Sequence, residues 1–197
     1  MNKAVLIFVK NIIEGRVKTR LAATLGNEAA MNIYRQLLQH AHDVIKNIDA
    51  AKIVSYSDVI EEDRWNNDEF KKELQQGIDL GKRMENAFIH AFETGYDSVI
   101  IIGTDCPEIN KNILETAFKE LNDFDIVIGP ATDGGYYLLG MKKLHSFLFK
   151  NMKWSTSTVF KDTIERCNAG QLSYFLLPEL SDIDEEKDLI HFKNYLI

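Results

Sequence analysis

The chain has 197 residues, of which 45% are hydrophobic and 27% are charged, and its formal net charge is -7. This is the composition of an ordinary globular protein, and a length that suits one domain, so we expect a single domain spanning residues 1–197. An acidic chain is poorly suited to neutralising nucleic-acid phosphates, so no nucleic-acid partner is expected.

The first predicted element is a strand at residues 4–9, where the sequence AVLIFV is apolar without alternation, as in a parallel strand buried on both faces. Six apolar residues are too few to cross a membrane, and the flanks of a signal peptide are lacking. We therefore expect a cytoplasmic protein without a membrane partner. That compartment also suits reduced thiols at Cys106 and Cys167.

Helices and strands alternate along the rest of the chain. Apolar residues at helical spacing predict helices at about 27–47, 80–92 and 113–121. Further strands are expected at 52–57, 98–103, 125–129, 136–140 and 172–177. The polar segment 59–76 predicts only irregular or short helical structure. Further helices are expected near 144–150, up to about Cys167, and at the end of the chain, where SDIDEEKDL opens the last helix. Such alternation is typical of βαβ units, so the predicted fold class is α/β with a mainly parallel sheet.

A basic segment follows the first strand, and ligands of open α/β sheets bind beyond the carboxyl ends of strands. No acidic residue lies between Glu14 and Glu28, and Gly15 permits a tight turn. The cations of this basic segment are Lys10, Arg16, Lys18 and Arg20. They can surround the phosphates of a small anionic ligand, or the segment can be a solvated loop. The segment matches neither the Walker A pattern nor GxGxxG.

Carboxylates stand at two further segments of this kind. Asp105 leaves the strand at 98–103 in GTDCP, where it can hold a divalent ion or cap the next helix. Asp182 and Asp184 lie in SDIDEEKDL, and either can be a metal ligand. Asp184 is also the simplest N-cap for the last helix.

The stretch GPATDGGYYLLG places Asp133 beside two glycines and an apolar run. A tight hairpin with a capping aspartate explains Asp133 and Gly134 but not Gly135, which is expected where another backbone or a ligand comes close. We expect both glycines to run beneath a sugar or acceptor, with Asp133 as the catalytic base. Trp154 can stack on a ligand or pack in the core, and Ser155 can bind an acceptor or cap a helix.

Six stretches together carry a resemblance that covers nearly the whole chain: FVKNIIEGRVKTRLAATLG, GIDLGKRM, IIGTDCPEI, GPATDGGYYLLG, WSTSTV and DIDEEKDL. Their order resembles the bacterial DUF2064 family, which is assigned to the glycosyltransferases and linked to arsenosugar or radical-SAM gene neighbourhoods. That family resembles the nucleotide-diphospho-sugar transferase (GT-A) superfamily. The resemblance implies a three-layer α/β/α sandwich with a mainly parallel mixed sheet, which binds a nucleotide and Mg²⁺ or Mn²⁺.

The resemblance also implies roles for individual residues. It implies nucleotide-phosphate contacts for Lys10, Lys18 and Arg20, a metal role for Asp105, and places near the reacting centre for Asp133 and Asp184. VKTRLAATLG is also similar to the start of 2-phospholactate guanylyltransferases, and DIDEEKDL to the tail of molybdenum-cofactor-type nucleotidyltransferases. Three departures stand out: Asp105 lacks the second acid of Asp-x-Asp, the basic segment has one glycine where nucleotidyltransferases have several, and Ile12 replaces a family proline.

We therefore expect a metal-dependent glycosyltransferase that uses a nucleotide-sugar donor and a small-molecule acceptor. The first alternative is a nucleotidyltransferase that joins NMP from an NTP to a small phosphorylated acceptor. The second is a non-catalytic nucleotide-binding module. The sequence leaves the oligomeric state open.

Overall fold

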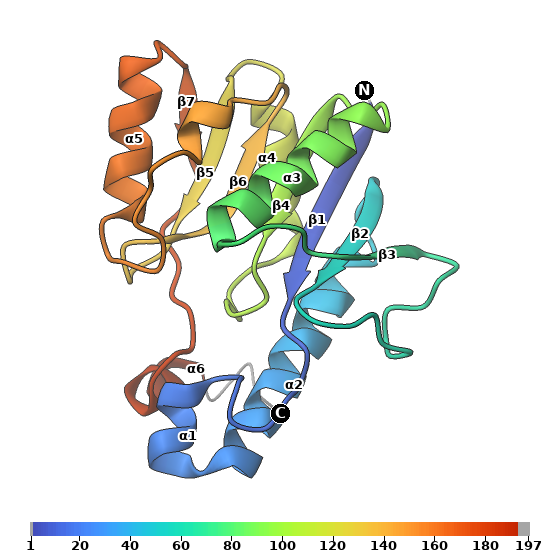
Figure 1. Ribbon diagram of the computed structural model, residues 1–197, viewed down its shortest axis with the longest axis vertical. Helices are drawn as coiled ribbons and strands as arrows, with labels where there is room; N and C mark the ends of the chain where they lie inside the picture. The colour runs from blue at the N-terminus through green and yellow to red at the C-terminus, as the bar shows by residue number, and fades with distance from the viewer. Residues whose placement is uncertain (1, 193–197) are drawn as a thin grey trace.

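The computed structural model describes residues 2–192 and contains a seven-stranded sheet (Figure 1). The strand order is β3-β2-β1-β4-β6-β5-β7, in which β6 runs antiparallel to both neighbours and all other pairs are parallel. The strands are β1 (Lys3–Val9), β2 (Ala51–Tyr56), β3 (Phe70–Leu74), β4 (Ser98–Ile102), β5 (Ile126–Pro130), β6 (Tyr136–Met141) and β7 (Tyr174–Leu176). This mainly parallel mixed sheet confirms the predicted fold class.

Helices cover both faces of the sheet, so the fold has three layers: helices, sheet and helices (Figure 1). They are α1 (Thr19–Leu25), α2 (Asn27–Ile45), α3 (Leu80–Glu93), α4 (Lys111–Glu120), α5 (Val159–Ala169) and α6 (Leu189–Phe192), with 3₁₀ helices η1 (Ser146–Leu148) and η2 (Glu186–Asp188). Within residues 2–192, none of these helices combines the length and the apolar character that a membrane span requires.

Two hydrophobic cores form because successive strand residues point to opposite faces. Val5 and Ile7 of β1 belong to the core that packs against α2 and α4. Ala4 and Leu6 belong to the core on the other face, against α3 and α5. The central strand β4 is buried along its whole length, which explains its unbroken apolar sequence.

Two elements were not predicted. The segment 59–76 was expected to be irregular or short helical surface, but residues 70–74 form the edge strand β3, so that prediction was wrong there. Its sequence FKKEL lacks an apolar run, and the strand is specified by tertiary contacts, with Phe70 packed edge-on against Trp65. The helix α1 begins directly after Lys18, whose φ of 47° is left-handed and which provides no side-chain cap.

Lys18 ties the N-terminal basic segment to two distant parts of the chain. Its side chain is only 3% exposed, and its ammonium donates to the Ile183 carbonyl at 2.5 Å. It also pairs with Asp105 at 2.7 Å and with Asp184 at 3.4 Å. Burial alone would lower the pKa of Lys18, but the neighbouring carboxylates, Asp105 first, raise it above its usual value. Lys18 therefore stays charged and joins the end of β4 to the segment before α6.

This arrangement predicts that Lys18→Met destabilises the protein. The substitution nearly preserves the length of the side chain but leaves the partly buried Asp105 without its cation. We expect this to lower the free energy of unfolding by about 1–3 kcal/mol. For a chain of this size that is roughly 2–4 °C in Tm for each kcal/mol, measurable by thermal unfolding. Lys161→Met is the matched control, because Lys161 is 76% exposed and its pair with Glu165 lies on the outer face of α5. An equal Tm for the two variants would show that Lys18 does not hold these segments together.

Candidate functional site

A cavity of about 830 Å³ lies beyond the carboxyl ends of β1 and β4, where the topology predicted a ligand site. Residues after β1 and β4 form its floor, and the segments 57–58, 133–137 and 154–159 line its sides. The Tyr34 hydroxyl lies under the floor, where it accepts from the Lys10 backbone N–H at 2.9 Å and lies 3.4 Å from the Thr104 hydroxyl. These bonds fix the ends of β1 and β4 relative to α2.

The predicted basic residues divide into two groups. Lys10, Arg16 and Arg20 line the cavity, and Arg16 and Arg20 are about two thirds exposed. The ammonium of Lys18 instead points away from the cavity into the contacts with Asp105 and Ile183. Gly15 has a φ of +73° and forms the predicted tight turn without lining the described cavity. Three cations of the predicted set therefore face the ligand space, and the fourth organises its acidic wall.

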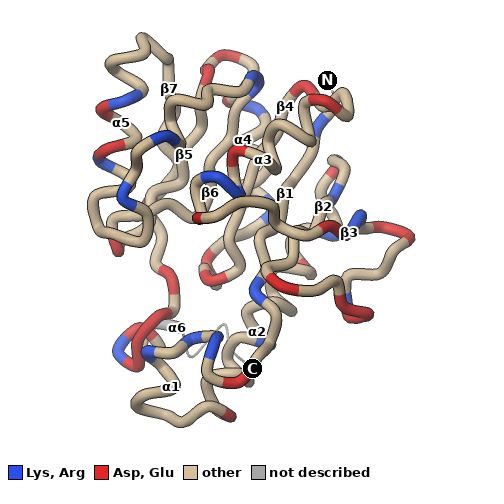
Figure 2. Tube along the Cα trace, viewed as in Figure 1, with Lys and Arg blue, Asp and Glu red and all other residues tan. Residues whose placement is uncertain are grey.

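Three of the predicted or alternative acids, Asp105, Asp182 and Asp184, gather around Lys18 directly before the start of α1. Figure 2 shows basic residues at the start of α1 near the acidic segment that leads into α6. Asp105, Asp133, Asp182 and Asp184 all line the cavity, as does Asp58, which pairs with Arg16 at 3.4 Å. Arg20 lies 3.7 Å from Asp184, so both walls of the cavity meet at this point.

Neither Asp105 nor Asp184 caps a helix. Asn110 caps α4, because its side chain accepts from the Ile113 N–H. Glu185 and Asp188 form a capping box at η2, and the Asp184 N–H donates to Asp188 at 3.0 Å. The capping alternatives for Asp105 and Asp184 were therefore wrong, and both side chains are directed to Lys18.

The family resemblance implied a place near the reacting centre for Asp184 and named no role for Asp182. No salt bridge joins Asp182 to another side chain within the described residues 2–192. Burial, and then the charge of Asp105, raise the pKa of Asp182 to about 8. The signal for it was the alternation Asp182-Ile183-Asp184, in which fully buried Ile183 turns the two carboxylates to the opposite side.

The turn before β6 combines both explanations of its sequence. The Asp133 carboxylate accepts from the Gly135 N–H at 2.8 Å, which is the capping role, and it also lines the cavity. Gly134 has a φ of +89°, and a Cβ there would lie 2.1 Å from the Ser157 carbonyl oxygen. The expected close approach at Gly134 is thus made by another backbone and not by ligand space, which corrects that prediction. Gly135 lines the cavity as expected.

Trp154 and Ser155 form the opposite rim. The Trp154 indole lies over Gly81 at the start of α3, where a Cβ would be 2.0 Å from its Nε1 atom. Trp154 lines the cavity and also packs against Phe149, so it serves both the core and the site. Ser155 has a φ of +61° and lines the cavity. It does not cap α5, which begins at Val159 after Thr158.

The carboxylates fit a divalent ion only in an open form. Among residues 2–192, no group of three or more His, Cys, Asp or Glu side chains is placed to enclose a metal ion. Mg²⁺ is commonly held by one or two carboxylates together with substrate phosphates and water. Asp182, whose negative charge is disfavoured next to Asp105, would gain from such a cation.

Comparison with known proteins places the chain. Residues 35–156 match the family DUF2064, described as an uncharacterized protein conserved in bacteria. The chain is 31% identical over 195 residues to 2-phospho-L-lactate guanylyltransferase of Methanocaldococcus jannaschii, with 91% of this chain and 82% of the relative covered.

Solved structures show the same fold. The crystal structure of a putative nucleotide-diphospho-sugar transferase from Desulfovibrio desulfuricans is 32% identical with a TM-score of 0.89, and the match covers 98% of this chain and 88% of that one. The inositol-1-phosphate CTP transferase from T. maritima is 13% identical with a TM-score of 0.62, covering 95% of this chain and 91% of that one. The DUF2064 match at residues 35–156 covers more than half of this chain, so the chain belongs to the DUF2064 family.

Proposed function

We propose that this chain is a nucleotidyltransferase, which joins the NMP part of an NTP to a small phosphorylated acceptor and releases pyrophosphate. The observation that carries the proposal is the meeting of a basic wall and an acidic wall in one cavity beyond β1 and β4. Similarity to the 2-phospho-L-lactate guanylyltransferases supports this activity over sugar transfer. It also makes GTP the first donor to test.

The basic wall supplies the charge that the leaving group requires. Lys10, Arg16 and Arg20 would bind the β- and γ-phosphates by charge-assisted hydrogen bonds. In the reaction an acceptor phosphate oxygen attacks the α-phosphorus, a new P–O bond forms, and the α–β phosphoanhydride bond breaks. The electron pair of that bond leaves with pyrophosphate, whose charge these cations stabilise.

The acidic wall would hold the cation that binds with the nucleotide. Asp105 and Asp182 are the ligands we propose, with Asp184 beside them. A bound Mg²⁺ or Mn²⁺ supplies neutralisation of the phosphate oxygens. Lys18 keeps Asp105 and Asp184 in place from the protein side.

The far rim would receive the acceptor. Gly135, Trp154 and Ser155 line the same cavity as the three cations. An ionised acceptor phosphate needs no proton removed before it attacks. Asp133, whose carboxylate already accepts from the Gly135 N–H, would thus position this rim in nucleotidyl transfer and would act as a base only in sugar transfer.

Sugar transfer remains the second candidate because of one observation. The putative nucleotide-diphospho-sugar transferase from Desulfovibrio desulfuricans matches 98% of this chain at a TM-score of 0.89. The same cavity would then bind an NDP-sugar, with the diphosphate on the basic wall. The two reactions release different products, so a direct assay separates them.

The assay incubates the protein and Mg²⁺ or Mn²⁺ with each NTP plus a set of small phosphorylated carboxylates, and separately with NDP-sugars. We expect pyrophosphate release from an NTP that depends on the acceptor. Release of a nucleoside diphosphate from an NDP-sugar, with no pyrophosphate from any NTP, would replace the proposal with the second candidate.

Arg20→Ala should weaken NTP binding by roughly ten- to hundred-fold, because one charge-assisted phosphate contact is lost. Isothermal titration with a non-hydrolysable NTP measures this change. Arg35→Ala is the matched control, because Arg35 lies on α2 and bonds Asn32 outside the cavity. Equal affinities for Arg20→Ala and the parent protein would remove Arg20 from the phosphate site.

Asp105→Asn and Asp182→Asn should have opposite effects on the metal-free protein. Asp105→Asn weakens the pair with Lys18 and should lower Tm, whereas Asp182→Asn replaces a buried carboxyl group whose raised pKa costs stability at neutral pH and should raise Tm. Both variants should reduce the rise in Tm that Mg²⁺ plus NTP produces. A full ligand-induced rise in both variants would show that neither residue holds the cation.

A further inference from the structure

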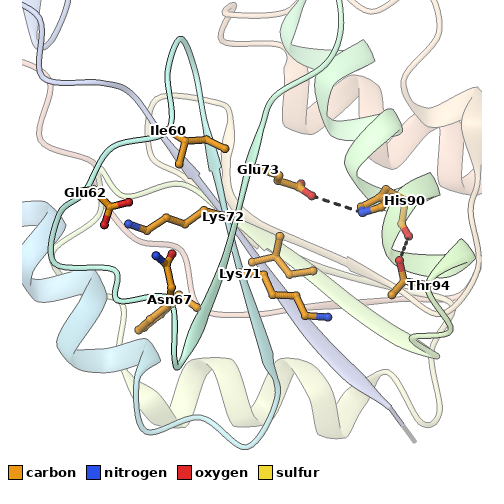
Figure 3. A pocket seen from close by; sticks show the side chains of 10 residues that line it. Ile60, Glu62, Asn67, Lys71, Lys72, Glu73, His90 and Thr94 are labelled. Carbon is orange, nitrogen blue, oxygen red and sulfur yellow. Dashed lines mark hydrogen bonds and ion pairs between the residues drawn. The ribbon is translucent and has the colours of Figure 1, made fainter.

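A second cavity, of about 580 Å³, lies at the β3 edge of the sheet, opposite the β7 edge (Figure 3). Four consecutive residues of β3, 70–73, line it. Because successive strand residues point to opposite faces, a cavity that touches all four must run along the edge of the strand. Ile60 and Asn67 flank this edge groove on one side, and His90 and Thr94 of α3 flank it on the other.

The edge groove follows a strand edge of the sheet. Within the described residues, β3 pairs only with β2, so its other edge has no strand partner. Such an edge is a template for another extended segment, and proteins commonly cover it or shield it with charge. An occupant of the groove would therefore be a strand.

The charges along β3 indicate which strand. Lys71 and Glu73 lie on the same face of the sheet, toward α3, where Glu73 is 3.8 Å from His90 and Lys71 lies 3.3 Å from the Tyr96 hydroxyl. In an antiparallel pair of two β3 strands centred on Lys72, each Lys71 stands opposite Glu73 of the second copy. We propose that this edge is a two-fold interface at which two copies of the chain join their sheets through β3.

A lysine at the centre of the pair does not oppose this arrangement. The Lys72 side chain is 4% exposed, donates to the Glu61 carbonyl at 2.6 Å and pairs with Asp63 at 3.2 Å. Its charge is thus neutralised inside its own subunit. Lys71 lies over the Tyr96 ring of its own subunit, at 5.8 Å from the ring centroid.

The apolar surface near β3 supports association. Eight large hydrophobic side chains are exposed in the described chain, and five of them fall within residues 59–80: Val59, Ile60, Leu74, Ile78 and Leu80. Of these, Ile60 lines the edge groove and Leu80 lines the larger cavity. A concentration of exposed apolar side chains beside a free strand edge is typical of an interface between proteins. An isologous dimer uses the same patch twice, as the Lys71 and Glu73 pattern requires.

Sedimentation velocity of the full chain at about 1–100 μM tests the proposal, and we expect a dimer at the upper end. Lys71→Glu and Glu73→Lys should each weaken the dimer by roughly ten- to hundred-fold, because two attractive pairs become repulsive. The double variant K71E/E73K restores opposite charges across the two-fold axis and should dimerise again. Lys161→Glu, on the remote α5, is the charge-matched control and should leave the dimer unchanged.

Hydrogen exchange gives a second readout that needs no substitution. Amides of β3 should exchange more slowly at high than at low protein concentration, while those of β7 should not change. A parent protein that stays monomeric, single variants that dimerise like the parent, or β3 amides insensitive to concentration would each overturn the proposal.

Discussion

The buried ammonium of Lys18 is the contact on which the geometry of the site depends. It is shared by two carboxylates and a backbone carbonyl, and those partners lie on segments far apart in sequence. Clustered acids repel one another, so without a cation of the protein's own the ends of β4 and of the C-terminal segment would tend to separate. One lysine placed between them fixes the acidic wall before any ligand binds. The cost is that Lys18 is unavailable to the ligand, and Lys10, Arg16 and Arg20 remain for that purpose.

The sequence predicted the central part of the fold because its strands are buried on both faces. β1 and β4 are apolar at almost every position, and their order with the intervening helices predicts a parallel sheet. The edge strand β3 gave no such signal, because only Phe70 is fully buried and the strand depends on contacts with distant residues. Local sequence therefore predicted the strands that are apolar along their whole length. It missed the edge strand, whose position depends on contacts with residues distant in sequence.

The same limit applies to the site. The strand ends located Asp105, Asp133 and the basic segment, since the topology gathers those ends at one edge of the sheet. Pairing could not be predicted, because Lys18 and Arg20 are two residues apart and equally basic, yet one is 3% exposed and the other 69%. The start of α1 turns them in different directions, and only the fold shows which carboxylates each one meets. Asp182 was underrated for the same reason, since its neighbours are distant in sequence.

The cavity and the edge groove share one segment of the chain. Ser57 and Asp58 line the cavity, and Ile60 lines the groove. The Asn11 side chain holds this segment from the floor of the cavity. Its Oδ1 accepts from the Asp58 N–H at 2.9 Å, and its Nδ2 donates to the Val59 backbone carbonyl at 2.7 Å. Lys72 holds the other end through the Glu61 carbonyl. A second copy paired at β3 would thus contact a segment that Asn11 already fixes to the floor of the cavity.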